Sequence, residues 1–174
     1  MPPTTMTMAC GLFTDGIRRP MNAPEIILLY AGDSSDGSEA REEVVLERLG
    51  AMRFKVVQSP GLVLGIAAGD VIEVSGDRFK IVTRGQNVAI QVFAREGLDE
   101  LEQRLTSSLS KLGGWLDGRA ALQLVYTVPV SAGFPAIEQA LRQTVAQYKG
   151  AEWYYGNVYD NDDGVTPLNW WLPT

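Results

Sequence analysis

The chemistry open to this chain of 174 residues is limited first by the side chains it lacks. It contains no histidine and one cysteine, Cys10, which excludes a Ser-His-Asp triad, a histidine proton shuttle, most zinc sites and a thiolate cluster. Carboxylates are the remaining acid/base groups. Asp70 is the first candidate, because a turn after Gly69 at a strand start could hold it in an apolar setting that raises its pKa. The alternative, which we favour, is that Asp70 accepts hydrogen bonds from backbone amides of its own turn.

Two further segments resemble binding loops but lack essential residues. YDNDDG, residues 159–164, has oxygen ligands before a glycine, as a calcium loop does. With Gly164 as the sixth position, however, Tyr159 and Trp170 occupy the first and twelfth positions, where an acidic ligand is required. GLVLGIAAGD, residues 61–70, lacks the Lys-Ser/Thr of a phosphate loop. We therefore predict an acidic turn, no metal ion and no cofactor.

The C-terminal segment EWYYGNVYDNDDGVTPLNWWLPT concentrates aromatic rings among acids. Trp and Tyr combine a large apolar area with a hydrogen-bonding tip and are common at interface hot spots, and carboxylates beside them would steer a basic partner. The alternative is that the segment wraps the domain, with its rings packed on the sheet and its acids solvated. The predicted partner-binding residues are Trp153, Tyr155, Tyr159, Asp160, Asp162, Asp163, Trp170 and Trp171.

Charge, apolar run length and cysteine content limit the classes of partner and the cellular compartment expected for this protein. The net charge is −6, and the acids gather in residues 33–47 and 150–174, a pattern that argues against phosphate-tracking nucleic-acid binding. The longest apolar stretch, residues 62–68, is much shorter than the ~20 residues of a membrane span, so no membrane association is expected. A single cysteine makes a reducing cytoplasm the default location. Residues 1–22 are expected to be a disordered tail, within which Met21 is an alternative start. The oligomeric state is left open.

The elements that position these residues begin with short strands. PEIILLYAG (24–32) is a strand, and EVVLERLG and MRFKVVQSP form a hairpin around Gly50, because apolar and polar residues alternate in the second run. DVIEV, RFKIV and VAIQVF follow, separated by turns at SGD and RGQN. Residues 23–93 are therefore predicted to form a small antiparallel β-barrel-like meander, since closure would remove exposed edges.

The second half is predicted from a helical period. Leu98, Leu101, Leu105, Leu109 and Leu112 fall at steps of three and four, with acids in the first turns and Gly113 as the stop. A strand over 121–129, a second helix from about 135 to 150 and a last strand in EWYYGNVY follow. Residues 87–158 thus resemble a ferredoxin-like (split βαβ) unit with one strand missing or altered and two helices on one sheet face. We expect VAIQVF to belong to both halves, and residues 159–174 to be an acidic aromatic tail.

Several short motifs resemble the bacterial domain-of-unknown-function family numbered 4265. They are Pro60, the pair Gly69 and Asp70 ahead of VIEV, RGQNVAIQVF, LSKLGGWLDG, LVYTVP and EWYYG, over about residues 40–156. The usual Gly-His-Ser type turn of the family appears here as RGQN, without its histidine. The resemblance implies the two-part fold and no established activity.

Three functions remain open from the sequence. The first is a non-enzymatic cytoplasmic binding protein, most concretely an immunity-type protein that occludes the active site of a basic toxin or effector domain with its acidic, aromatic surface. The second is a small-molecule sensor or regulatory module with a ligand between the two halves. The third is a carboxylate-dependent hydrolase that uses Asp70.

Overall fold

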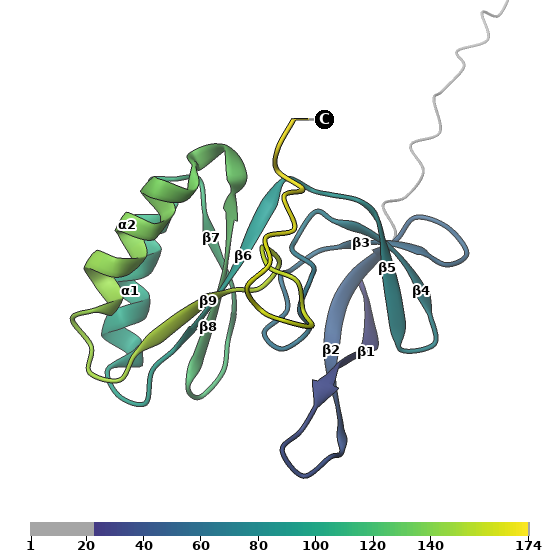
Figure 1. The fold of residues 1–174 in the computed structure, drawn as a ribbon, viewed down its shortest axis with the longest axis horizontal. Coiled ribbons are helices and arrows are strands. Elements are labelled where there is room, and N and C mark those ends of the chain that lie inside the picture. Colours follow the sequence, from purple (N-terminus) through teal and green to yellow (C-terminus); the bar gives the residue numbers. More distant parts are fainter. Residues whose placement is uncertain (1–22, 174) are drawn as a thin grey trace, which may run out of the picture.

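Two antiparallel sheets lie side by side in the computed structural model, which describes residues 23–173 (Figure 1). The first half of the chain forms a five-stranded sheet, and the second half forms a four-stranded sheet with two helices. The predicted tail, residues 1–22 with Cys10 and Met21, falls outside the described residues. Within the described part, no helix combines the length and the apolarity needed to cross a membrane.

The first sheet is a meander in which each strand pairs with the next one in the chain. Its strands are β1 (Glu25–Asp33), β2 (Glu39–Arg48), β3 (Arg53–Val56), β4 (Val71–Ser75) and β5 (Arg78–Thr83), in the spatial order β1-β2-β3-β4-β5. In β3, Phe54 and Val56 are buried and Arg53 and Lys55 are exposed, the alternation that predicted this strand. The inward side chains form a core of their own around Leu29, Leu46 and Ile72.

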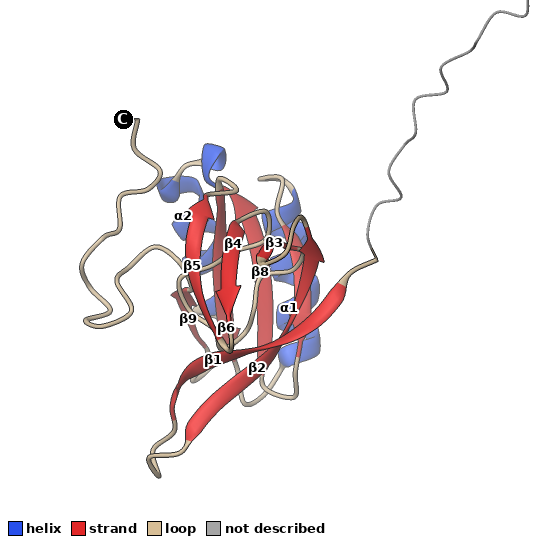
Figure 2. Ribbon diagram, turned by 90° about the vertical axis from the view of Figure 1, so that its right-hand side faces the viewer, coloured by secondary structure: helices blue, strands red, loops and turns tan. Residues whose placement is uncertain are grey.

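The predicted barrel-like closure of this meander is wrong, because the sheet is open. β1 and β5 are its two ends and are not joined by a ladder; they meet through a backbone hydrogen bond from Tyr30 N–H to the carbonyl of Asp77 in the β4–β5 turn (2.8 Å) and through the Arg78 guanidinium of β5, which lies over the Tyr30 ring. β3 pairs with only Leu46–Arg48 of β2, so the rest of β2 has β1 as its neighbour and the two strands extend past the sheet as a ribbon (Figure 2). A closed barrel requires a hydrogen-bond ladder between its first and last strands, and the sheet has none between β1 and β5.

The second sheet is covered on one face by both helices (Figure 1). The chain passes through β6 (Asn87–Phe93), α1 (Leu98–Ser110), β7 (Trp115–Arg119), β8 (Gln123–Pro129), a short 3-10 helix (Val130–Ala132), α2 (Phe134–Val145) and β9 (Glu152–Tyr155). The strand order is β7-β8-β6-β9. The predicted α+β class with two helices is confirmed. Among the described strands, β6 pairs with β8 and β9 and belongs to the second sheet alone, so the expectation that it joins both sheets is wrong.

The leucine period of α1 corresponds to its packing. Leu98, Leu101, Leu105 and Leu109 are buried and form the second core with residues of β6, β8 and α2. In α2, Pro135 lies in the first turn, where its missing N–H costs no helical hydrogen bond. α1 therefore covers the sheet through the apolar face that its leucines predicted.

A loop between β3 and β4, residues 57–70, connects the two halves, and we call it the junction loop. Glu42 of β2 accepts hydrogen bonds from the N–H groups of Gly61, Leu62 and Val63 at 2.7, 2.8 and 2.8 Å. From the other side, Gln123 of β8 donates to the carbonyl of Gly61 (2.6 Å). The loop is thus bonded to both sheets at once.

Candidate ligand-binding pocket

A cavity of about 470 Å³ lies at the free edge of the second sheet, next to β9. Its walls come from β6, β9, α2, the turn over residues 159–164 and one residue of the junction loop, Leu64. The remaining lining residues are Gln91, Glu138, Arg142, Trp153, Tyr154, Tyr155, Gly156, Tyr159, Asp160, Asn161 and Gly164. We call it the β9 pocket. Its volume lies in the range of small-molecule sites.

The pocket extends around the edge strand. Gln91 pairs with Tyr154 and Ile90 pairs with Tyr155 in the β6–β9 ladder, and successive residues of a strand point to opposite faces. Ile90 belongs to the core beneath the helices, so Tyr155 lies on the helix face and Gln91 and Tyr154 lie on the face turned toward the first half. The pocket therefore contacts both faces of the sheet.

Two buried polar groups of this pocket lack a hydrogen-bond partner. Gln91 is only 5% exposed, and neither its amide Nε2 nor the Tyr155 hydroxyl has a partner at full hydrogen-bond geometry among the described residues. The Glu138 carboxylate lies near enough to the Tyr155 hydroxyl to affect its pKa. A side chain built at Gly156 would place its Cβ 3.5 Å from Gln91 Nε2, and Gly156 itself lines the pocket, so the amide nitrogen lies directly behind this part of the pocket wall. Buried polar atoms are nearly always bonded, and an orphan beside a cavity indicates a group that enters the cavity.

Burial controls the protonation of the Tyr155 hydroxyl. Loss of solvent raises its pKa, and the nearby carboxylate of Glu138 raises the pKa further, because a phenolate beside an anion is disfavoured. Arg142 acts in the opposite direction but forms an ion pair with Glu138 (2.6 Å). Tyr155 therefore stays protonated at physiological pH and keeps its O–H available as a donor.

The aromatic walls are steeply inclined to one another. The ring centroids of Trp153 and Tyr155 are 5.2 Å apart with an interplanar angle of 81°, and those of Tyr155 and Tyr159 are 6.3 Å apart at 50°. Phe134 of α2 supports Tyr155 from behind at 5.6 Å and 89°. Because no two of these rings stack face to face, they form walls of different orientation and do not fill the pocket as a single layer.

The segment after β9 is fixed to the sheet by buried hydrogen bonds. The side chain of Asn157 accepts from Ala89 N–H (3.0 Å) and donates to the carbonyl of Asn87 (2.9 Å). Gly65 N–H of the junction loop donates to the carbonyl of Gly156 (2.7 Å). The turn that closes the pocket therefore has a defined position relative to both halves.

The predicted partner-binding residues separate into two groups. Trp153, Tyr155, Tyr159 and Asp160 line the β9 pocket, whereas Asp162 lies beside a different depression, next to Tyr30 and Arg78. The remaining three, Asp163, Trp170 and Trp171, do not line the pocket.

Asp163 and the two tryptophans have local structural roles. Asp163 accepts hydrogen bonds from Val165 and Thr166 within its own turn, and the Thr166 hydroxyl and these amides lower its pKa. Trp170 and Trp171 are half-buried against the second core; Trp170 donates from Nε1 to the carbonyl of Asn157 (2.7 Å). The alternative in which the rings pack on the domain therefore describes Trp170 and Trp171, whereas Trp153, Tyr155, Tyr159 and Asp160 line the pocket.

The pocket also contains residues that sequence reasoning missed. Gln91, Glu138 and Arg142 come from elements far from the C-terminal segment in the sequence. The one signal for Gln91 was a lone polar residue in the apolar strand VAIQVF. The i and i+4 positions of Glu138 and Arg142 are typical of any surface helix, so they gave no signal.

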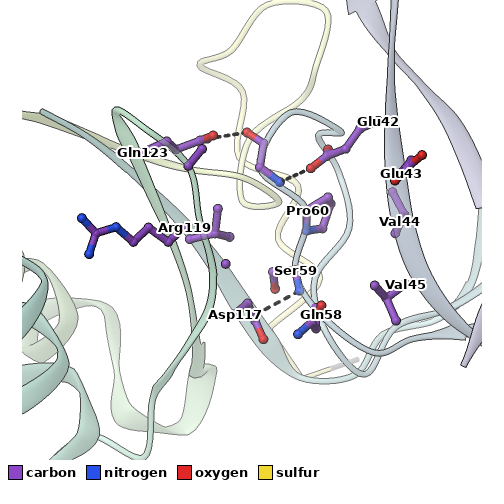
Figure 3. A pocket seen from close by; sticks show the side chains of 14 residues that line it. Glu42, Glu43, Val44, Val45, Gln58, Ser59, Pro60, Asp117, Arg119 and Gln123 are labelled. Carbon is purple, nitrogen blue, oxygen red and sulfur yellow. Dashed lines mark hydrogen bonds between the residues drawn. The ribbon is translucent and has the colours of Figure 1, made fainter. Parts of the chain in front are cut away.

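A second, smaller cavity of about 190 Å³ lies between the sheets (Figure 3). There Asp117 accepts a hydrogen bond from the backbone of Ser59 (3.0 Å) and another from the Thr127 hydroxyl, and Ser59 Oγ lies 2.5 Å from Thr127 Oγ1. Figure 3 shows Glu42 and Gln123 reaching the junction loop from opposite sides. Since its polar groups are bonded to one another, we interpret this cavity as part of the junction between the halves.

Asp70 is wholly buried and fully engaged. It accepts hydrogen bonds from Gly85 N–H (2.7 Å), Ala67 N–H (3.0 Å) and Arg84 Nη1 (3.1 Å). Burial raises its pKa, while these donors act to lower it. The backbone-bonding alternative for Asp70 agrees with this geometry, although one of its amide partners comes from a different turn. Among residues 23–173, no group of three or more Asp, Glu, His or Cys is arranged to hold a metal ion.

The comparisons with known proteins give a family and a fold. The family model described as Domain of unknown function (DUF4265) matches residues 42–153, which include Gln91, Glu138, Arg142 and Trp153 of the pocket. A solved structure described as "Novel crystal structure of a hypothetical protein from Neisseria gonorrhoeae" is similar with a TM-score of 0.56 and 12% identity, over 80% of this chain and 96% of that chain. That likeness concerns the fold alone. No curated protein matches the chain.

Proposed function

Because the chain belongs to the DUF4265 family, as the sequence motifs indicated, and the family name carries no activity, we propose a function from the site itself. The protein is a binding protein that holds a small-molecule ligand in the β9 pocket, as a sensor or regulatory module does. The ligand contacts both halves, because Leu64 of the junction loop lines the pocket together with residues of α2 and β9.

The observation that carries this proposal is the pair of unpartnered polar groups. An unpaired buried donor costs about 1–3 kcal/mol, and Gln91 and Tyr155, the residues that carry these groups, both line the β9 pocket, one on each face of the sheet. A ligand that supplies acceptors to these groups recovers that energy in addition to the contacts it makes with the aromatic walls.

A non-enzymatic role is supported by the composition and by Asp70. The chain has no histidine, and the carboxylate that was the first candidate for acid/base catalysis is bonded on both of its oxygens. A reducing cytoplasm is the proposed location, since one cysteine suits it.

A thermal-shift screen of metabolites tests the proposal. A ligand present at 100 times its Kd stabilises the protein by about 2.7 kcal/mol, which raises the Tm by roughly 5–11 °C for a chain of this size. Gln91→Leu and Tyr155→Phe should abolish or reduce the shift. Tyr148→Phe is the matched control, because the buried Tyr148 hydroxyl likewise has no partner at full hydrogen-bond geometry within residues 23–173 but Tyr148 does not line the pocket. Equal shifts in Tyr155→Phe and Tyr148→Phe would refute the proposed site.

A protein partner is the second candidate function, as for an immunity-type protein that neutralises a basic toxin. It is favoured by the exposure of Tyr154 (51%) and Tyr159 (37%) at the rim and by the exposed Asp162 carboxylate in the adjoining turn. A basic side chain of the partner would enter the pocket. The test combines Tyr159→Ala with charge reversal at Asp160 and Asp162. If a captured toxin binds this variant as tightly as it binds the wild type, the protein-partner function is excluded.

We also assign a ferredoxin-like topology to the second half. The element order β6-α1-β7-β8-α2-β9 with the strand order β7-β8-β6-β9 supports this assignment, since it supplies the strand that the sequence reading left missing or altered. β7 is that strand.

A further inference from the structure

We infer that the ligand of the β9 pocket is a small organic cation that also carries an oxygen acceptor. This inference rests on the proposed function and specifies the chemical class of the ligand. It is carried by three features of the pocket: ring faces, an excess of carboxylates and an unpaired amide donor.

The first feature is the set of rings. Trp153, Tyr155 and Tyr159 meet at steep angles, whereas Tyr154 lines the pocket from the other face of the sheet. The face of an aromatic ring is electrostatically negative and attracts an ammonium or alkylammonium group. Walls of different orientation allow several rings to contact one compact cationic head.

The second feature is the balance of charge. Two carboxylates, Glu138 and Asp160, line the pocket against one guanidinium, that of Arg142. Arg142 is paired with Glu138, and 71% of its side chain is exposed, so it lies toward solvent. Asp160 forms no ion pair among the described residues; its Oδ1 accepts the N–H of Asp162 (2.8 Å). One carboxylate is thus left to balance a cationic ligand.

The third feature is the Gln91 amide. Its Nε2 is a donor, is buried and has no acceptor among the described residues. A purely cationic ligand such as a tetraalkylammonium ion offers no acceptor, so it would leave this group unpaired. A hydroxyl, ester or carboxylate oxygen on the same ligand would pair it.

Isothermal titration calorimetry with a defined set of probes tests the ligand class. Choline, ethanolamine and glycine betaine carry both groups. Dimethylbutanol, the uncharged carbon isostere of choline, lacks the charge, and tetramethylammonium lacks the oxygen. We expect at least one of the first three to bind, and about tenfold weaker binding of the two deficient probes.

Paired variants locate the binding groups. Tyr159→Leu should weaken binding about tenfold and Tyr159→Phe should not, because the ring face is what attracts the cation. Asp160→Asn, which keeps the acceptor for the Asp162 amide, should also weaken binding, whereas Asp162→Asn, two residues away, should not. Circular dichroism and the Tm of each variant establish that the fold is retained.

The outcomes separate this inference from the proposed function. Two results would overturn the cation assignment and leave the ligand-binding function intact. The first is equal affinity for choline and dimethylbutanol. The second is that no cationic probe binds while a neutral or anionic metabolite does, and that Gln91→Leu abolishes this binding. Failure of every probe and every metabolite to bind would overturn both.

Discussion

Replacing Gly85 with alanine tests the contact between the chain entering β6 and the end of the junction loop. A Cβ at Gly85 would lie 2.3 Å from the carbonyl carbon of Gly69 and 2.7 Å from the backbone nitrogen of Asp70. Both neighbours are backbone atoms, so no side-chain rotation relieves the clash. Any shift of the chain would also lengthen the hydrogen bond from Gly85 N–H to Asp70 (2.7 Å).

The magnitude follows from these two effects. Overpacking costs about 1–3 kcal/mol, and a weakened hydrogen bond to a buried carboxylate adds about 1.5–3 kcal/mol. We expect Gly85→Ala to lower the free energy of unfolding by roughly 3–5 kcal/mol and the Tm by roughly 6–20 °C. Urea denaturation followed by circular dichroism, with calorimetry for the Tm, measures both quantities.

Gly118→Ala is the matched control. A Cβ there meets no atom within 4 Å, so the free energy of unfolding should change by less than about 1 kcal/mol. A loss at Gly85 no greater than that at Gly118 would refute the close backbone approach and the stabilising effect of the hydrogen bond from Gly85 to Asp70.

Three further predictions concern hydrogen bonds of the two halves. Burial raises the pKa of Tyr126 to about 12 from 10.0, so the folded state keeps the hydroxyl proton to a higher pH than the unfolded state does. The contribution of Tyr126 to the free energy of unfolding is therefore complete below pH 10 and is lost as the pH rises toward 12. Tyr126→Phe removes the hydroxyl that bonds Thr106 and should cost about 1 kcal/mol at pH 7. In urea denaturation at rising pH the wild type should lose roughly 2 kcal/mol by pH 12, so the variant should become the more stable protein; a difference that stays constant would contradict the shift. Glu42→Ala removes the acceptor of three N–H groups and should cost roughly 3 kcal/mol, with faster hydrogen exchange at residues 61–63 than at β6 amides; equal acceleration everywhere would indicate a purely global effect. Asn157→Ala leaves the N–H of Ala89 and the carbonyl of Asn87 unpaired and should cost about 2–4 kcal/mol in the same denaturation assay; a cost below 1 kcal/mol would mean that water replaces the amide.

Periodic patterns predicted the elements well. The leucines of α1 and the alternation of β3 depend on residues close in sequence, and the structure buries Leu101, Leu105 and Phe54 as expected. β7 was missed because WLDGR lacks alternation and contains Gly118, where the ladder to β8 shifts register. A bulge of this kind removes the signal on which a strand prediction depends.

Contacts between distant residues accounted for the errors. Closure of the first sheet depends on whether β1 meets β5, which composition does not encode. The C-terminal rings were identified as a group, but the sequence did not indicate that Trp170 and Trp171 pack on the second core while Trp153 and Tyr155 line a pocket. Gln91 was missed because a polar residue in a strand is ordinary until the missing partner is known.

The junction loop has a consequence for cooperativity. It supplies Val63 and Ile66 to the first core, and it is also bonded to β8 through Gln123 and to the chain after β9 through Gly156. If either half unfolded, amide groups of the junction loop would lose their hydrogen-bond partners. The two halves are therefore expected to unfold together in one transition. A heating scan should accordingly give one endotherm whose calorimetric and van't Hoff enthalpies agree, and expressed fragments ending near residue 84 should remain unstructured.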